Sequence, residues 1–170
     1  MLEARSIALG YHAGEDRLVL FLASGTAERQ LLLTRRICLG LIRTLGDLLE
    51  RSAAAGQDLP DDIREAVVFI EHQRSIFDPP EARPRNAAKA RARLDLETAR
   101  LVTAIQIKSS PQEFVLLASA GEDPVAQFKF GRRDLHRFVE ALKTQAETAQ
   151  WDSPLAEGWL GLADGAVTVD

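Results

Sequence analysis

The sequence predicts an α+β fold in which a strand–strand–strand–helix unit occurs twice, and three observations lead to this prediction. Short apolar or alternating segments closed by turns are typical of antiparallel strands. After each set of three such segments in the sequence, apolar residues recur at three- and four-residue spacing, which predicts an amphipathic helix. Arg-Arg stands at the start of both predicted helices, at 35–36 and 132–133.

The first unit is predicted over residues 1–57. Strands are expected at 4–12, 16–24 and 29–34, with the turns AGED and SGTAE between them. Thr34 can cap the following helix, because its hydroxyl can accept from a free N–H of the first turn. The apolar face of that helix is expected to comprise Cys38, Leu41, Ile42, Leu45, Leu48 and Leu49.

The second unit is predicted over residues 101–150. Its strands are expected at 101–108, 113–120 and 124–130, before a helix with the apolar face Leu135, Phe138, Val139, Leu142 and Ala146. An ungapped offset of 97 carries 35–36 onto 132–133 and 18–20 onto 115–117, while the first strands fit better at 98. This agreement favours an internal duplication with a pseudo-two-fold relation, in which antiparallel sheets are packed by helices.

Residues 58–100 are predicted to connect the two units. A helix is expected from Leu59 to Phe77, with an acidic first turn. We predict that its inner stripe is formed by Ile63, Val67, Ile70 and Phe77. A proline-rich linker at 78–86 and a short helix within 87–100 should follow, and residues 151–170 form an apolar tail to what we expect to be one compact domain.

Composition excludes several classes of protein. The chain has 170 residues, a net charge of −4 and no apolar run long enough to cross a bilayer. A single cysteine cannot form an intramolecular disulfide, and the N-terminal residues do not resemble a secretion signal. These features predict a cytoplasmic protein without membrane contact, and the excess of Arg over Lys indicates a GC-rich bacterial genome.

No motif predicts catalysis. His12, His72 and His136 have no metal-ligand spacing, and His72 is interpreted as a polar residue on a helix face. Cys38 falls on an apolar helix face, and the sequence contains neither a phosphate loop nor a serine nucleophile elbow. We therefore predict no catalytic residue, no metal and no cofactor.

Two groups of basic residues are candidate anion or nucleic-acid contacts. Arg35, Arg36, Arg132 and Arg133 oppose the dipole of the helix that each pair begins, which calls for a compensating group. That group is either a bound anion or an acidic side chain nearby. The second group lies at residues 83–100, a segment with a local charge of +4 that is either a nucleic-acid arm or a solvated linker. The candidate contacts in it are Arg83, Arg85, Lys89, Arg91 and Arg93.

The tail is too apolar for a merely solvated segment. Its large apolar residues are Trp151, Leu155, Trp159, Leu160 and Leu162. They either fold back onto the core or anchor a partner, since aromatic residues in pockets carry much of the energy of an interface.

The function predicted from these features is a non-enzymatic protein-interaction or assembly module: an adaptor, a chaperone-like binder or a structural subunit of a bacterial or phage complex. Its partner is another protein or a second copy. In topology alone, duplicated strands followed by a helix resemble Whirly proteins and purine-rich-element-binding repeats, which implies single-stranded nucleic-acid binding as the alternative. The acidic net charge and the few strand aromatics, Phe21, Phe114, Phe128 and Phe130, disfavour that alternative.

Overall fold

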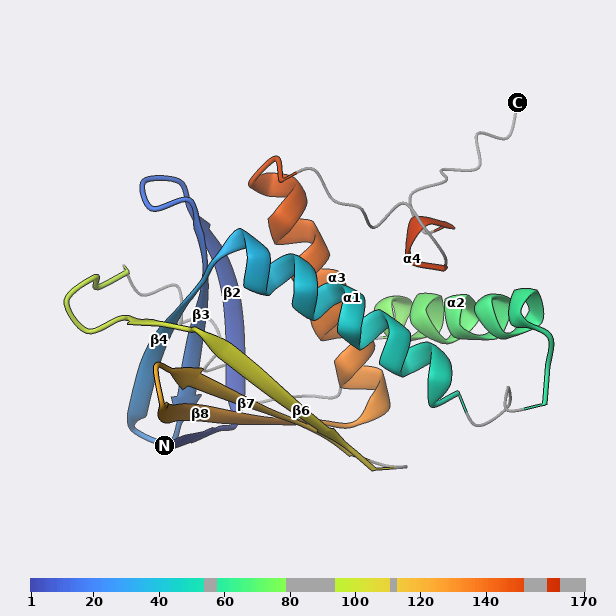
Figure 1. The fold of residues 1–170 in the computed structure, drawn as a ribbon, viewed down its shortest axis with the longest axis horizontal. Coiled ribbons are helices and arrows are strands. Elements are labelled where there is room, and N and C mark those ends of the chain that lie inside the picture. The colour runs from blue at the N-terminus through green and yellow to red at the C-terminus, as the bar shows by residue number, and fades with distance from the viewer. Residues whose placement is uncertain (54–57, 79–93, 111–112, 152–158, 163–170) are drawn as a thin grey trace.

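Two four-stranded sheets lie on one side of the molecule and three long helices on the other, so the α+β class is confirmed (Figure 1). The computed structural model describes residues 1–53, 58–78, 94–110, 113–151 and 159–162. Among its helices, none combines the length and the apolar character needed to cross a bilayer.

The first half of the chain has the predicted strands and helix, preceded by one short extra strand. Its elements are β1 (Leu2–Ala4), β2 (Ser6–His12), β3 (Arg17–Ser24), β4 (Ala27–Leu33) and α1 (Arg35–Arg51). The cap is confirmed, because Thr34 Oγ1 accepts a hydrogen bond of 3.2 Å from the amide of Ile37. The predicted apolar face of α1 is turned inward, with Leu48 half-buried and the other five residues buried.

The second half has the same order of elements. They are β5 (Arg100–Leu101), β6 (Ala104–Ser109), β7 (Phe114–Ala120), β8 (Asp123–Phe130) and α3 (Arg132–Thr148). All five residues predicted for the apolar face of this helix are buried. α1 and α3 each have 17 residues.

The two halves exchange short strands, which the sequence did not reveal. The sheets have the orders β1-β8-β7-β6 and β2-β3-β4-β5. β1 pairs in parallel with β8, with Leu2 opposite Ala126, whereas β2 begins two residues after β1 ends, in the other sheet. β5 likewise pairs in parallel with β4 of the first half. The strands predicted at 4–12 and 101–108 are therefore each divided between two sheets.

Equivalent tight turns join β3 to β4 and β7 to β8. Their first residues, Gly25 and Gly121, have φ values of 62° and 64°, which suit the two-residue turns that begin with glycine. These glycines are 96 positions apart, whereas the starts of α1 and α3 are 97 apart. A register shift between Ala118 and Ser119 accounts for the difference. The ungapped offset is thus wrong across this hairpin, and a common origin of the halves stays a prediction.

α1 and α3 pack against each other and join both sheets in one core. Leu20 and Leu31 contribute to it from one sheet, and Phe114 and Phe128 from the other. A bond between the halves supports this arrangement, because the Arg29 guanidinium on β4 donates to the carbonyl of Val125 on β8 at 2.7 Å.

The connecting helix, α2 (Asp61–Phe77), packs on α3 in the reverse of the predicted orientation. The predicted inner residues Ile63, Ile70 and Phe77 are 44%, 56% and 80% exposed, and Val67 is half-buried. The buried residues of α2 are instead Val68, His72 and Ser75. The prediction was wrong because the side of α2 that faces α3 carries polar groups with partners there.

Two further segments complete the described chain. The predicted short helix is absent from the described part of its range, since residues 94–99 form turns and coil. α4 (Trp159–Leu162) lies against α2 and near α1. A Cβ at Gly46 of α1 would lie 2.8 Å from Leu160 Cδ1, so a larger residue there would displace the Leu160 side chain.

Candidate functional site

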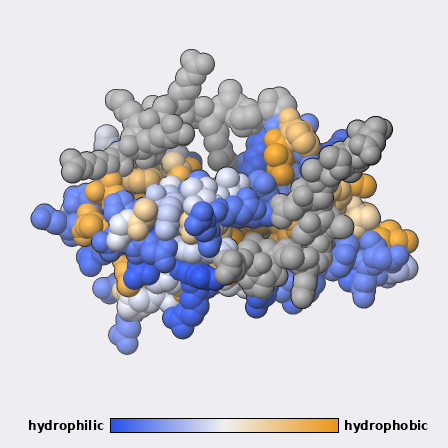
Figure 2. Space-filling model, turned by 90° about the horizontal axis from the view of Figure 1, so that it is seen from above, coloured by the Kyte–Doolittle hydropathy of each residue, from blue (hydrophilic) through white to orange (hydrophobic). Residues whose placement is uncertain are grey.

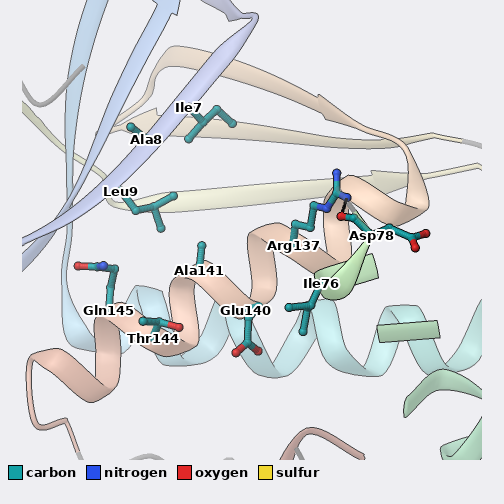
Figure 3. A pocket seen from close by; sticks show the side chains of 10 residues that line it. All are labelled: Ile7, Ala8, Leu9, Ile76, Asp78, Arg137, Glu140, Ala141, Thr144 and Gln145. Atoms are coloured by element: carbon teal, nitrogen blue, oxygen red, sulfur yellow. Dashed lines mark hydrogen bonds between the residues drawn. The ribbon is translucent and has the colours of Figure 1, made fainter. Parts of the chain in front are cut away.

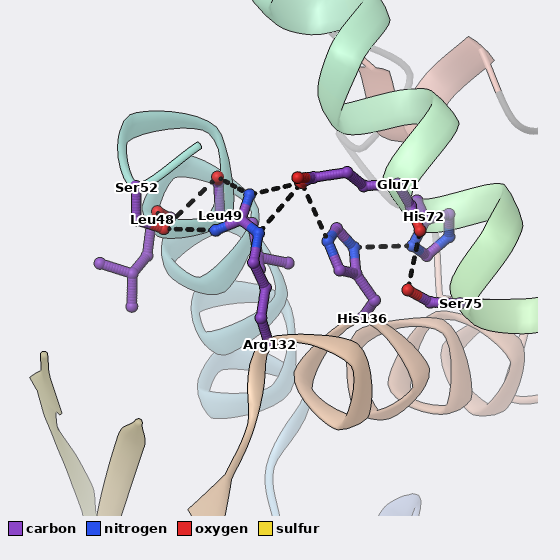
Figure 4. Close-up of polar contacts among 8 residues, drawn as sticks. All are labelled: Leu48, Leu49, Ser52, Glu71, His72, Ser75, Arg132 and His136. Atoms are coloured by element: carbon purple, nitrogen blue, oxygen red, sulfur yellow. Dashed lines mark hydrogen bonds and ion pairs between the residues drawn. The ribbon is translucent and has the colours of Figure 1, made fainter. Parts of the chain in front are cut away.

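Two buried histidines meet where α2 packs on α3. The Nδ1 atoms of His72 and His136 are 3.3 Å apart, and the two residues are 0% and 1% exposed (Figure 4). A polar pair in this position must be hydrogen-bonded to be tolerated. His72 was predicted as a polar residue on a helix face, and its burial corrects that prediction.

A carboxylate stands at each end of the histidine pair. His72 Nε2 lies 3.1 Å from Glu140 Oε2, within hydrogen-bonding distance. At the other end, His136 Nε2 lies 3.7 Å from Glu71 Oε2, which is an electrostatic contact and too long for a hydrogen bond. Among the described residues, His136 Nε2 is the buried side-chain nitrogen that lacks a hydrogen-bond partner.

These distances constrain the protons of the pair. An ionised Glu140 requires the proton of His72 on Nε2, so His72 Nδ1 accepts and His136 Nδ1 donates. A neutral His136 then has an unprotonated Nε2 facing Glu71. In this arrangement His136 Nε2 is the ring nitrogen without a hydrogen-bond partner among the described residues, and a further proton taken up by the pair would bind there.

The environment of His136 opposes that further proton. Burial lowers the pKa of His136 below its ordinary value of 6.5, and the nearby positive charge of Arg132 and coupling to His72 lower it further. Glu71 acts in the opposite direction without reversing the shift. The ring of Trp159 covers both imidazoles edge-on, with centroid distances of 5.0 Å to His72 and 5.8 Å to His136.

Arg132 connects this network to α1. Its Nη2 donates to Glu71 Oε2 at 2.6 Å and to the carbonyl of Leu49 at 2.8 Å, while Nη1 donates to Ser52 Oγ at 2.8 Å. Burial alone would raise the pKa of Glu71, but His136 and Arg132 hold it below its ordinary value. Three helices are therefore joined through one guanidinium.

A groove of about 530 Å³ runs between β2 and α3, beside the network (Figure 3). Its apolar lining includes Ile7 and Leu9 of β2 and Ala141 of α3. Glu140 also lines the groove, and its carboxylate lies 3.1 Å from His72 Nε2. Neither histidine is among its lining residues, so the groove meets the histidine pair through Glu140.

The predicted anion contacts have different roles in the structure. Arg35 and Arg36 are exposed at the start of α1. Arg132 is engaged within the chain as described, and Arg133 forms an ion pair of 3.1 Å with Asp78. In the second half an acidic side chain thus supplies the compensation expected for the pair. Arg83, Arg85, Lys89, Arg91 and Arg93 lie outside the described residues.

The described tail residues pack within their own chain. Trp151, Trp159 and Leu160 are buried, which leaves them little surface to offer a partner. Trp151 Nε1 donates to Asp16 Oδ1 at 2.8 Å, and Tyr11 donates to the same oxygen at 2.9 Å. Leu162 ends α4, and Leu155 lies outside the described residues.

Other reactive or stacking groups are enclosed. Burial raises the pKa of the Cys38 thiol to about 12, so it is not a thiolate at neutral pH. Phe114, Phe128 and Phe130 are buried in the core, and Phe21 is half-buried. Within the described part of the chain, no three His, Cys, Asp or Glu side chains are arranged to hold a metal.

Sequence reasoning missed the network because its members are distant in the chain. The two histidines are separated by 64 positions, and neither lies in a recognisable motif. One local signal was present: His136 and Glu140 are four residues apart and share a helix face. Comparison with protein-family models, with curated proteins and with solved structures returned no match.

Proposed function

We propose that this protein is a non-enzymatic assembly module that associates through the outer face of α2. The observation that carries the proposal is the orientation of that helix. Ile63, Ile70 and Phe77 point away from the core although polar side chains face inward. Exposed apolar side chains that form a contiguous patch mark interaction surfaces.

The spacing of these residues fits another helix. Ile63, Ile70 and Phe77 recur every seven residues, the repeat that places side chains along one seam between packed helices. Ala66, between them, is exposed and small enough for close approach. Apolar side chains reach the surface at the end of the molecule that α2 occupies (Figure 2).

The proposed occupant of this face is α2 of a second copy. An antiparallel pair about a two-fold axis sets Ile70 against the same residue of the second copy, and Ile63 against Phe77. The same residues are buried on both sides of the seam, which makes the face self-complementary. The internal use of His72, His136 and Arg132 supports a role in assembly over one in chemistry.

Sedimentation equilibrium of the full chain over a range of concentrations tests the proposal. We expect a reversible dimer, and we expect Ile70→Glu to convert it to a monomer because the substitution buries two like charges at the two-fold axis. Leu96→Glu, at an exposed leucine of the 94–99 segment, is the matched control and should leave the dimer intact. A wild-type protein that is monomeric throughout, or an Ile70→Glu dimer, would refute self-association through α2.

A further inference from the structure

A second surface, the groove between β2 and α3, has the features of a site for an extended polypeptide. β2 is the outer strand of its sheet and pairs with β3 alone among the described residues. No described backbone hydrogen bond outside the ladders involves residues 7–11. An edge strand of this kind presents N–H and C=O groups to which another chain can add.

The groove beside this edge can receive side chains of an added strand. Ile7 and Leu9 on one wall and Ala141 on the other form an apolar lining. Thr144 and Gln145 supply polar groups at one part of the rim. Side chains of an added strand alternate between its two faces, so every second residue can enter the groove.

The charged side chains that line the groove indicate which type of residue an added strand would place there. Arg137 also lines the groove, but it donates to the carbonyls of Ser75 and Asp78 at 2.7 Å each. The Asp78 carboxylate pairs with Arg133. Glu140 differs, because its partner His72 is fully buried while the Glu140 side chain as a whole is 31% exposed.

Glu140 is therefore a preoriented acceptor at the groove. His72 fixes the carboxylate, and its hydrogen bond lowers the pKa of Glu140, with a smaller contribution from Lys143. An oriented carboxylate next to an apolar wall suits a cation on a long aliphatic stem.

We propose that this groove binds an extended segment of a partner protein, which adds to the edge of β2 and places a Lys or Arg side chain on Glu140. Neighbouring apolar side chains of the segment lie against Ile7, Leu9 and Ala141. α2 contributes Ile76 to the groove, whereas Ile63, Ile70 and Phe77 are not among its lining residues. Ile70→Glu should therefore abolish the dimer and leave segment binding unchanged.

Selection of displayed random peptides on the full chain, followed by anisotropy measurements with the selected peptides, tests this site. We expect enrichment of peptides in which a Lys or Arg stands among alternating apolar residues. Replacing that residue by Ala should weaken binding at least about tenfold, and so should Glu140→Gln, whereas Glu147→Gln on the exposed side of α3 should not.

A second variant separates loss of binding from loss of folding, since Glu140 also holds His72. Ala141→Phe fills the groove without touching the histidine pair, and it should abolish binding while the circular dichroism spectrum is retained. Amide exchange within residues 7–11 should slow when the peptide binds. No enriched peptide, enriched peptides without a basic residue, or affinity unchanged by both groove variants would overturn the proposal.

Discussion

α1 and α3 occupy corresponding places in the two halves, yet their inner faces differ in chemistry. The buried residues of α1 are apolar apart from Gly46, whereas α3 also buries His136 and Lys143. The leading arginine of α1, Arg35, is exposed, and that of α3, Arg132, reaches Glu71. The difference follows from α2, which packs chiefly on α3 and brings Glu71 and His72 with it. A third helix thus turns one of two similar units into a polar site.

The largest expected effect on the free energy of unfolding concerns the buried apolar residues, in which the two halves are alike. Leu45 on α1 and Leu142 on α3 are both fully buried, so Leu45→Ala and Leu142→Ala should each lower the free energy of unfolding by about 3 kcal/mol. Urea unfolding followed by circular dichroism measures both. Leu101→Ala, at an exposed residue of β5, is the control. A loss at either buried site no larger than that of the Leu101→Ala control would contradict its place in the shared core.

The next largest effect on stability concerns the leading arginines of α1 and α3, in which the two halves differ. Arg132→Ala leaves Glu71 without its main partner and removes bonds to Ser52 and Leu49, so we expect a loss of about 2 kcal/mol. Arg35→Ala, at the exposed equivalent, should lower stability by no more than about 1 kcal/mol, the usual upper range for an exposed charged contact. Unfolding measurements on the two variants compare them directly, and equal losses would contradict the asymmetry.

The smallest effect is a dependence on pH that belongs to the second half. The pKa of His136 is lower in the folded protein than its ordinary 6.5, so the unfolded state binds a proton more readily. Stability should be full above pH 6.5 and decline as the pH falls below it. Glu71 and Glu140, whose pKa values are also lowered, act in the same direction at more acidic pH, below their ordinary 4.5.

Urea midpoints measured from about pH 8 to about pH 5 check this dependence. His136→Gln should flatten the curve near neutrality, since Gln does not titrate there. His12→Gln, at the end of β2 and outside the network, should keep the wild-type slope. A slope unaffected by His136→Gln would assign the dependence to another group.

The strands and the two long helices of the halves could be predicted because their patterns are local. Alternation and turn residues located β3 and β8, and three- and four-residue spacing located the faces of α1 and α3. Periodicity in α2 also identified a face correctly as apolar. It could not say which way that face turns, because the direction depends on the partners of His72 and Ser75 in α3.

The candidate site and the strand exchange depend on contacts between distant residues. His72 meets His136 only after α2 has packed on α3, and no spacing within either helix encodes that contact. β1 and β5 have three and two residues, too few for a pattern, and each pairs with a strand of the other half. The groove in turn exists only because β2 is left at the edge of its sheet.

The exchange of β1 and β5 also sets the order in which the protein can form. During synthesis β2, β3 and β4 can assemble as soon as they are made, but β4 acquires its outer neighbour only when residues 100–101 have been added. β1 waits longer still, until β8 exists to receive it. Closing such long loops is slow, because their entropy is lost before the pairing rewards it. Each half therefore carries an unfilled sheet edge for as long as the other is missing.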